Sequence, residues 1–278
     1  MLYLVLAVLS SVLVSIIMRI SGKHARNNLT MLAANYLMCS AMALYYTGDV
    51  HLFPQENGLS FALGLGIVSG IFYLGSFIML QWNTHTNGVV LSSLFMKLGV
   101  LVPTFMSILF FHEIPTLFQI LGMIGAIAAI LIINLEKGSG KAASSLGLVI
   151  LLLSGGGTDG MSKIYEELGS APLKNHFLLY AFIVAFILCV ALCLIKKQGI
   201  TGKDLFFGLL IGVPNYFSAR FLLLSLSSVP AVVAYPTYSV GSIITVTLAG
   251  VAIFREKLSR RQLIAMGIIL VALVLLNI

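Results

Sequence analysis

The chain has 278 residues, of which 59% are hydrophobic and only 9% are charged, and its formal net charge is +7. A water-soluble domain carries about 25% charged residues, so the composition excludes a polar exterior that faces water. The basic excess does not indicate nucleic-acid binding, because most basic residues lie in short loops between apolar runs.

Apolar runs long enough to cross a bilayer, about 20 residues each, follow one another along the chain. The first run lacks a basic N-terminal region and a small-residue cleavage site, so we expect a retained helix and not a signal peptide. The runs occupy residues 2–20, 30–47, 59–81, 89–111, 117–135, 146–165, 174–195, 204–226, 231–254 and 262–278. The sequence therefore predicts an all-α polytopic membrane protein with ten transmembrane helices and no soluble domain.

The three cysteines, Cys39, Cys189 and Cys193, all fall inside apolar runs. Disulfides are not expected there, and the one-turn spacing of Cys189 and Cys193 favours core packing over a metal pair. We expect no metal site and no cofactor.

An internal repeat divides the chain. Residues 88–135 align with residues 231–278 without a gap at an offset of 143, with nine identical positions. At an offset of 144 the earlier runs also align, so the repeat comprises five helices. The predicted domains are a first repeat at 1–135, a linker at 136–145 and a second repeat at 146–278.

Because five is odd, the second repeat enters the membrane from the opposite side, and the two repeats are predicted to be inverted. Inverted repeats supply two near-equivalent conformations, one open to each side, which alternating access requires. Loop charges agree with inversion, since the loop after residues 30–47 is acidic while its repeat partner, KKQGITGK (196–203), is basic.

Basic loop residues concentrate on one side of the predicted membrane. Twelve lie on that side and only Lys163 and Lys174 on the other. By the positive-inside rule, the crowded loops are cytoplasmic and both termini lie outside a plasma membrane. The twelve are Arg19, Lys23, Arg26, Lys137, Lys141, Lys196, Lys197, Lys203, Arg255, Lys257, Arg260 and Arg261.

Several motifs carry a family resemblance. Each repeat ends in an apolar helix, a short loop with Glu, then Gln and a small-residue helix: FFHEIPTLFQILGMIGAI (110–127) and IFREKLSRRQLIAMGIIL (253–270). With VPAVVAYPTYSVGSI (229–243) and SGGGTDGMSK (154–163), the whole chain resembles the drug/metabolite transporter superfamily, specifically its EamA-type ten-helix members. The resemblance implies transport, but this superfamily carries amino acids, nucleotide sugars, phosphorylated sugars, amines and drugs. The chain lacks the basic C-terminal tail of common members, so orientation is not inferred from them.

The resemblance also implies a central cavity between the third, fourth, eighth and ninth predicted helices, completed by the first and sixth. The fifth and tenth predicted helices contain almost nothing polar and are expected to be peripheral scaffold. Lys97 lies about halfway along the fourth predicted helix, and Arg220 lies in the eighth. A charge at such depth faces a wet cavity or a partner, so both are substrate-site candidates. The alternatives are a buried carboxylate or helix end beside Lys97 and snorkelling of Arg220.

Asp159 and Lys163 are four residues apart on one predicted helix, a spacing that favours a local ion pair. A structural pair is the first interpretation. If the pair opens during transport, Asp159 is the coupling candidate and Lys163 a substrate contact.

The glycine-rich segment SGGGTDG (154–160) is not a phosphate-binding loop, because no Gly-Lys-Ser/Thr follows. Close packing is one explanation, as for Gly66/Gly70 and Gly208/Gly212. We favour a flexible or broken helix that lines the substrate site.

Aromatic residues gather in the third, eighth and ninth predicted helices and are expected to contact the less polar part of a substrate. Tyr216 lies one turn before Arg220 and is expected to hold its guanidinium by a cation–π contact. Pro103 is expected to kink the fourth helix, and Glu113 and Glu256 to cap the helix after each. The polar and aromatic candidates are Tyr73, Tyr216, Tyr235, Tyr238 and Asn215.

Cationic candidates inside the spans (Lys97, Arg220 and Lys163) outnumber the acidic one, Asp159. This balance favours a secondary transporter of a small anionic or zwitterionic metabolite. One alternative is an exporter of organic cations or drugs that uses Asp159 for proton coupling. A second is an intramembrane enzyme, but HEIP (112–115) lacks the second histidine of a metal motif. The expected partners are a small-molecule substrate and the lipid bilayer; proton or exchange coupling, and monomer or homodimer, stay open.

Overall fold

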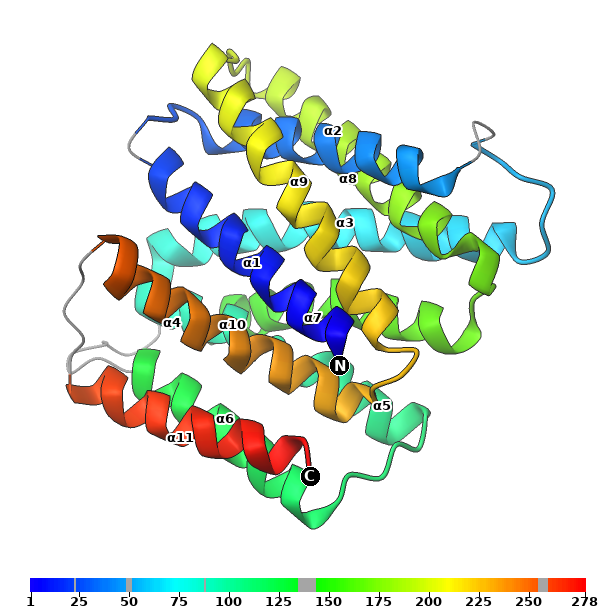
Figure 1. The fold of residues 1–278 in the computed structure, drawn as a ribbon. Helices are drawn as coiled ribbons and strands as arrows, with labels where there is room; N and C mark the ends of the chain where they lie inside the picture. Colours follow the sequence, from blue (N-terminus) through cyan, green and yellow to red (C-terminus); the bar gives the residue numbers. More distant parts are fainter. Residues whose placement is uncertain (23, 49–51, 88, 135–143, 255–259) are drawn as a thin grey trace. The chain divides into compact units, whose positions relative to one another are not determined.

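The computed structural model describes residues 1–22, 24–48, 52–87, 89–134, 144–254 and 260–278 (Figure 1). Glu256 and most of the predicted linker fall outside these ranges. The described residues form helices and their connections. The helices are α1 (Leu2–Ser21), α2 (Asn28–Thr47), α3 (Leu59–Asn87), α4 (Val89–Leu98), α5 (Leu101–Phe110), α6 (Leu117–Asn134), α7 (Ser145–Leu168), the 3-10 turn η1 (Ala171–Leu173), α8 (Lys174–Ile195), α9 (Gly202–Ser225), α10 (Ala231–Phe254) and α11 (Arg260–Leu276).

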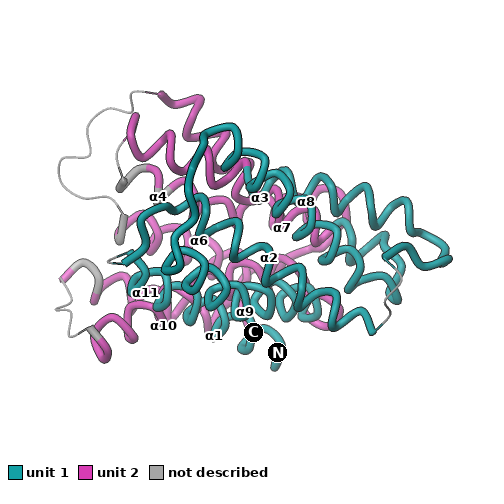
Figure 2. The backbone as a smooth tube through the Cα atoms, turned by 90° about the horizontal axis from the view of Figure 1, so that it is seen from above, with its two compact units in different colours: residues 1–74, 164–225 teal, residues 75–163, 226–278 magenta. Residues whose placement is uncertain are grey.

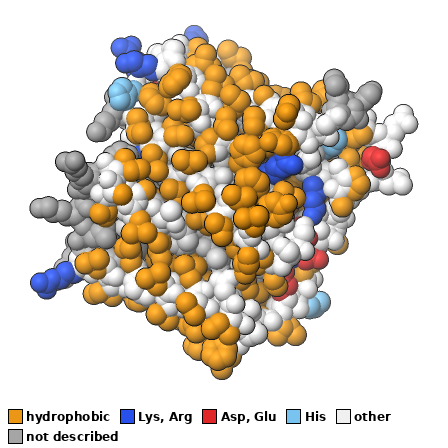
Figure 3. All heavy atoms as spheres, viewed as in Figure 1, with side chains coloured by type: hydrophobic (Ala, Val, Ile, Leu, Met, Phe, Trp, Pro, Cys, Tyr) orange, Lys and Arg blue, Asp and Glu red, His pale blue; other side chains and the backbone are white. Residues whose placement is uncertain are grey.

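The fold class is all-α, as predicted, and each predicted run corresponds to helix. By length and composition, six of the described helices can cross a membrane: α1, α2, α3, η1 with α8, α9 and α10. Shorter apolar stretches lie at Phe95–Phe110, Leu117–Ile132 and Leu263–Leu276. Hydrophobic side chains cover most of the face in Figure 3. Leu109 and Leu194 are 65% and 73% exposed, an exterior suited to lipid and not to water.

The chain forms two compact units, shown in different colours in Figure 2. Unit 1 comprises residues 1–74 and 164–225, and unit 2 comprises residues 75–163 and 226–278. Each unit combines helices from both halves of the sequence repeat. The repeat equivalents α2 and α8 pack together in unit 1, and the equivalents α6 and α11 pack together in unit 2.

Glycines set the close helix contacts of unit 1. A Cβ added to Gly66 or to Gly70 of α3 would lie 2.6 Å from the Cβ of Tyr180 or Val184 on α8. On α9, a Cβ at Gly212 would lie 2.5 Å from the Cβ of Met38 on α2. Real Cβ atoms cannot approach so closely, so these glycines let the helix backbones meet. This confirms the packing role predicted for them.

The core of unit 2 is built from small and branched apolar residues of α6, α10 and α11. Its buried members are Ala126, Ala129, Val240, Ile244, Ala265, Ile269 and Ala272. At one end of the unit, the buried Asn83 of α3 donates hydrogen bonds to the carbonyls of Met79 and Gly147, both at 2.9 Å. This amide ties α3 to the first turn of α7.

The predicted span 89–111 is interrupted. It forms α4 and α5 with a break at Gly99 and Val100. Pro103 has no N–H and cannot bond to the carbonyl of Gly99, which accepts instead from the N–H of Val102 at 2.9 Å. The kink expected from Pro103 is therefore present, as a break just before that residue.

The break packs against the glycine-rich segment of α7, and this corrects one prediction. α7 runs without interruption through residues 154–160, so the segment is not a broken helix. A Cβ on Gly156 would overlap the carbonyl oxygen of Gly99, and a Cβ on Gly99 would lie 2.9 Å from the nitrogen of Gly156. The glycines therefore serve close packing, and the interrupted helix is the one they pack against.

Candidate functional site

A cationic site lies among aromatic rings in unit 1. The Cζ atom of Arg220 on α9 is 4.0 Å from the centroid of the Tyr46 ring, in the last turn of α2. Its Nη1 atom donates a hydrogen bond of 3.3 Å to the hydroxyl of Tyr216. Tyr216 therefore orients the guanidinium, as predicted, but by a hydrogen bond. The cation–π partner is Tyr46, which the sequence reasoning missed.

The aromatic surroundings extend across four helices of unit 1. The Tyr46 ring stacks on Tyr216 with centroids 5.7 Å apart, and Tyr216 contacts Phe182 of α8 at 6.2 Å. Phe182 lies 5.4 Å from the predicted site residue Tyr73 of α3, which lies 5.6 Å from Tyr36 of α2. Tyr36 and Phe182 were also missed, since nothing in their apolar runs distinguishes them from core residues.

A second polar cluster in unit 1 is made of amide and thiol side chains from α2 and α9. Asn215, another predicted site residue, donates from Nδ2 to the Oδ1 of Asn35 at 3.2 Å and to the Sγ of Cys39 at 3.6 Å. The thiol of Cys39 in turn donates to the carbonyl of Gly212 at 3.3 Å. Asn35 is 4% exposed. The sequence reasoning missed Asn35, although a polar residue inside the apolar run 30–47 could have indicated it.

The charge of Arg220 is not matched by a carboxylate in the described part of the chain, where its one recorded hydrogen bond goes to Tyr216. A guanidinium carries five N–H donors in a planar fork that fits carboxylate or phosphate oxygens. The side chain is half-buried, so part of it stays accessible. With Tyr46 and Tyr216 beside it, the guanidinium of Arg220 is therefore a candidate contact for an anionic group.

The other predicted residues belong to unit 2, and Lys163 has an unexpected partner there. Its Nζ atom lies 2.7 Å from the Oε1 of Glu113, and its ammonium lies 5.4 Å from the centroid of the Phe111 ring. Lys163 is 1% exposed. A described ion pair therefore joins Lys163 to Glu113, a partner that the sequence reasoning did not expect. The i, i+4 spacing favoured a local pair, but a carboxylate from another segment supplies the countercharge.

Glu113 also occupies the start of a helix that is distant in sequence. Its two carboxylate oxygens accept hydrogen bonds from the N–H groups of Ala231 at 3.1 Å and Val232 at 3.0 Å. We expected Glu113 to cap the helix that follows it. That helix, α6, instead begins with reciprocal bonds between Thr116 and Gln119. The carboxylate thus stabilises the N-terminus of α10.

Asp159 and the two tyrosines of α10 complete the unit 2 candidates. The hydroxyl of Tyr235 donates to the backbone carbonyl of Asp159 at 2.7 Å, and Tyr235 is 0% exposed. The half-buried carboxylate of Asp159 therefore does not mediate this contact. Tyr238 is half-buried one turn further along α10. This hydrogen bond connects α10 to α7.

Lys97 lies in the last turn of α4, immediately before the break, and its side chain is exposed. The sequence predicted a position about halfway along a continuous helix. Lys97 instead lies at a helix end. Among the described residues, no cluster of three His, Cys, Asp or Glu side chains could hold a metal ion.

Comparisons with known proteins cover nearly the whole chain. The family model described as the EamA-like transporter family matches residues 1–135 and 143–278. An uncharacterized protein of Haemophilus influenzae (strain ATCC 51907 / DSM 11121 / KW20 / Rd) is 24% identical, and the match covers 92% of this chain and 91% of that one. A protein crystal structure aligns with 99% of this chain and 94% of its own at a TM-score of 0.69 and 14% identity. The last similarity concerns the fold alone.

Proposed function

Because the chain belongs to the EamA-like transporter family, within the drug/metabolite transporter superfamily, we propose that it is a secondary active transporter of a small polar metabolite. The substrate is anionic or zwitterionic, and transport proceeds by alternating access. Nothing in the family assignment favours the intramembrane enzyme.

The observation that carries this proposal is the environment of Arg220. A cation removed from water is costly unless a countercharge and hydrogen bonds accompany it. The described residues supply Arg220 with an aromatic face and one hydroxyl, but with no carboxylate. A carboxylate or phosphate of the substrate would supply the missing charge. The half-buried rings of Tyr46 and Tyr73 would contact its less polar part, while the buried Tyr216 holds the guanidinium.

Transport assays of purified protein test this assignment. A thermal-shift screen of anionic, zwitterionic and cationic metabolites identifies ligands, since a ligand that binds the folded state stabilises it. Uptake of each hit into proteoliposomes then follows, for the parent chain and for Arg220→Lys. Lysine keeps the charge but loses the planar fork, so binding of the anion should weaken strongly. Arg26→Lys, the same change at an exposed loop position, is the matched control.

The assignment fails if organic cations are carried and Arg220→Lys transports them as well as the parent chain does. It also fails if Arg26→Lys reduces uptake as much as Arg220→Lys. Either result would separate Arg220 from substrate recognition.

Alternating access rests on the inverted repeat, which we propose as ten transmembrane helices in a plasma membrane with both termini outside. Gly199 and Asn57 lie in equivalent loops of the two repeats and are exposed. Inversion places these loops on opposite sides of the membrane. In intact cells, an impermeant thiol reagent should label Asn57→Cys but label Gly199→Cys only after permeabilisation. Labelling of both from one side would contradict inversion.

The alternative proposal is an exporter of organic cations in which Asp159 binds substrate and proton in turn. The half-buried carboxylate of Asp159 in the middle of α7 favours it. Asp159→Asn should then abolish accumulation driven by a proton gradient. If accumulation of a cationic substrate persists in this variant, Asp159 is not the coupling residue.

A further inference from the structure

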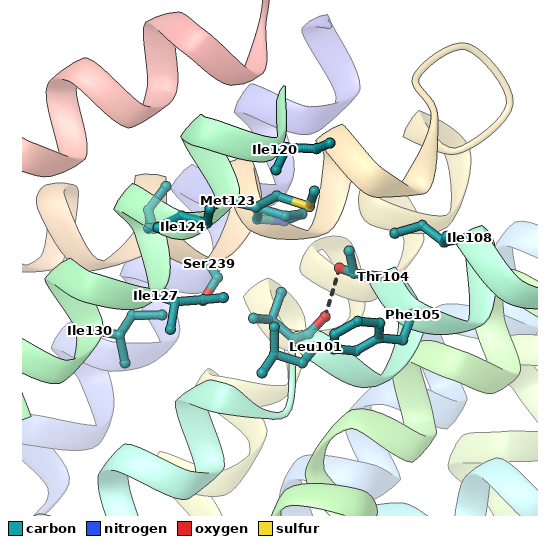
Figure 4. Close-up of a pocket in the computed structure, with 14 residues that line it drawn as sticks. Leu101, Thr104, Phe105, Ile108, Ile120, Met123, Ile124, Ile127, Ile130 and Ser239 are labelled. Atoms are coloured by element: carbon teal, nitrogen blue, oxygen red, sulfur yellow. Dashed lines mark hydrogen bonds between the residues drawn. The ribbon is translucent and has the colours of Figure 1, made fainter. Parts of the chain in front are cut away.

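Unit 2 contains an apolar pocket of about 160 Å³ that plays no part in the site described above. It lies between α5, α6 and α10, and Figure 4 shows side chains of α5 and α6 pointing toward one another across it. Its floor is formed by Ala126, Ile130 and Val240, which are 3%, 1% and 0% exposed. The pocket thus reaches into the core of the unit.

The lining is unsuited to a polar ligand or to water. Its polar side chains are the hydroxyls of Thr104 and Ser239, and Thr104 already donates to the carbonyl of Val100 at 2.9 Å. A polar group placed here would lose its hydrogen bonds to water without replacement. Apolar cavities of about 150 Å³ stay dry and accept hydrocarbon ligands. The lining is therefore suited to a hydrocarbon.

The rim of the pocket belongs to the apolar exterior of the unit. Phe105 of α5 and Ile124 of α6 are 56% and 58% exposed, and both line the pocket. Exposed apolar side chains on membrane helices face the acyl chains of lipids. The pocket is therefore continuous with the lipid-facing surface, and its volume admits a few methylene groups but not a helix.

We propose that this pocket binds the end segment of a phospholipid acyl chain from the surrounding bilayer. The bound chain contacts Val100 and Leu101, which line the pocket at the break between α4 and α5. The lipid thus supports the interrupted helix where its backbone has fewest helical hydrogen bonds.

Photocrosslinking tests the proposal on the full chain in phosphatidylcholine nanodiscs that contain a lipid with a diazirine near the end of one acyl chain. Labelled residues are mapped by peptide mass spectrometry. Ile130 and Val240 should be labelled, because a chain that enters the pocket reaches them. Leu270 on α11, which is 56% exposed and does not line the pocket, is the control for ordinary lipid contact.

Variants that fill the pocket distinguish a lipid chain bound inside it from chance contact of lipid with the protein surface. Ser239→Phe and Ile127→Phe each place a ring in the space, so one interpretable variant remains if the other fails to fold. Labelling of Ile130 and Val240 should fall to background in the filled variants while Leu270 stays labelled. The proposal is overturned if the floor is unlabelled in the parent chain, as it would be with a second copy seated on the pocket. It is also overturned if filling leaves floor labelling unchanged.

Discussion

The ammonium of Lys163 lies 2.7 Å from the carboxylate of Glu113, and the same carboxylate accepts the first backbone N–H groups of α10. One side chain thus joins the end of α7, the segment after α5 and the start of α10. The partners of Glu113 are distant in sequence: Lys163 is 50 residues away and Ala231 is 118 residues away. This carboxylate thus connects α7 to α10 in unit 2.

Glu113→Gln should destabilise the protein by about 3 kcal/mol, because it leaves the buried Lys163 without the charge of its recorded partner. The amide still accepts a hydrogen bond from α10, so the loss is chiefly electrostatic. Thermal unfolding in detergent measures it. Adding Lys163→Met to Glu113→Gln should restore most of the stability, since the buried ammonium is then gone. Equal stability of Glu113→Gln and the parent chain would show that the pair contributes little.

Tyr46→Leu should weaken binding of an anionic ligand by about two- to thirtyfold, because a cation–π contact that positions Arg220 contributes about 0.5–2 kcal/mol. Tyr46→Phe keeps the ring and should bind nearly as well as the parent chain. Titration of a ligand identified by thermal shift measures both. A loss in Tyr46→Phe as large as in Tyr46→Leu would assign the effect to the hydroxyl.

Gly156→Ala should cost about 1–3 kcal/mol through overpacking, because its Cβ would overlap the carbonyl oxygen of Gly99 and lie 2.6 Å from the Cβ of Val102. Gly155→Ala is the matched control, since its Cβ would meet the Sδ of the flexible Met96 side chain at 2.9 Å. That change should be tolerated far better. The unfolding temperatures of Gly156→Ala and Gly155→Ala in detergent test this prediction. Equal temperatures would contradict the packing argument.

Asp204→Asn should cost about 1–3 kcal/mol, because a buried acceptor is replaced by a group that presents N–H donors to other donors. Asp204 is 0% exposed and accepts from the N–H of Arg26 at 2.8 Å and the hydroxyl of Thr201 at 2.7 Å. Thr201→Val removes one donor and should cost less. Unfolding in detergent again provides the measurement, and the reverse order of the two variants would contradict this account.

The positions of the helices could be predicted because they depend on local sequence. Asn27 accepts from the N–H of Leu29 at the start of α2, and Gly48 ends that helix with a φ of +70°. Such caps act within a few residues. The apolar run between them supplies the helix itself. The ends of α2 (Asn28–Thr47) therefore lie close to those of the predicted run 30–47.

The break at Gly99 is a feature that local sequence patterns did not place correctly. Three adjacent glycines in α7 suggested an interrupted helix, yet α7 is continuous and the interruption lies before Pro103. Glycine only permits a close approach or a break. Which of the two occurs depends on the backbone that packs against it, and here Gly156 accommodates the carbonyl of Gly99.

The sequence by itself determined the all-α class, the apolar runs, the repeat and the residue types available for a site, because composition and periodicity are properties of the chain alone. Only the tertiary structure decided that Glu113 pairs with Lys163 and that Tyr46 faces Arg220. Inside an apolar environment a charge is stabilised by whichever partner the packing of helices brings near, at any distance in sequence. Helix periodicity predicts neighbours four residues away, but it contains no information about partners that another helix supplies.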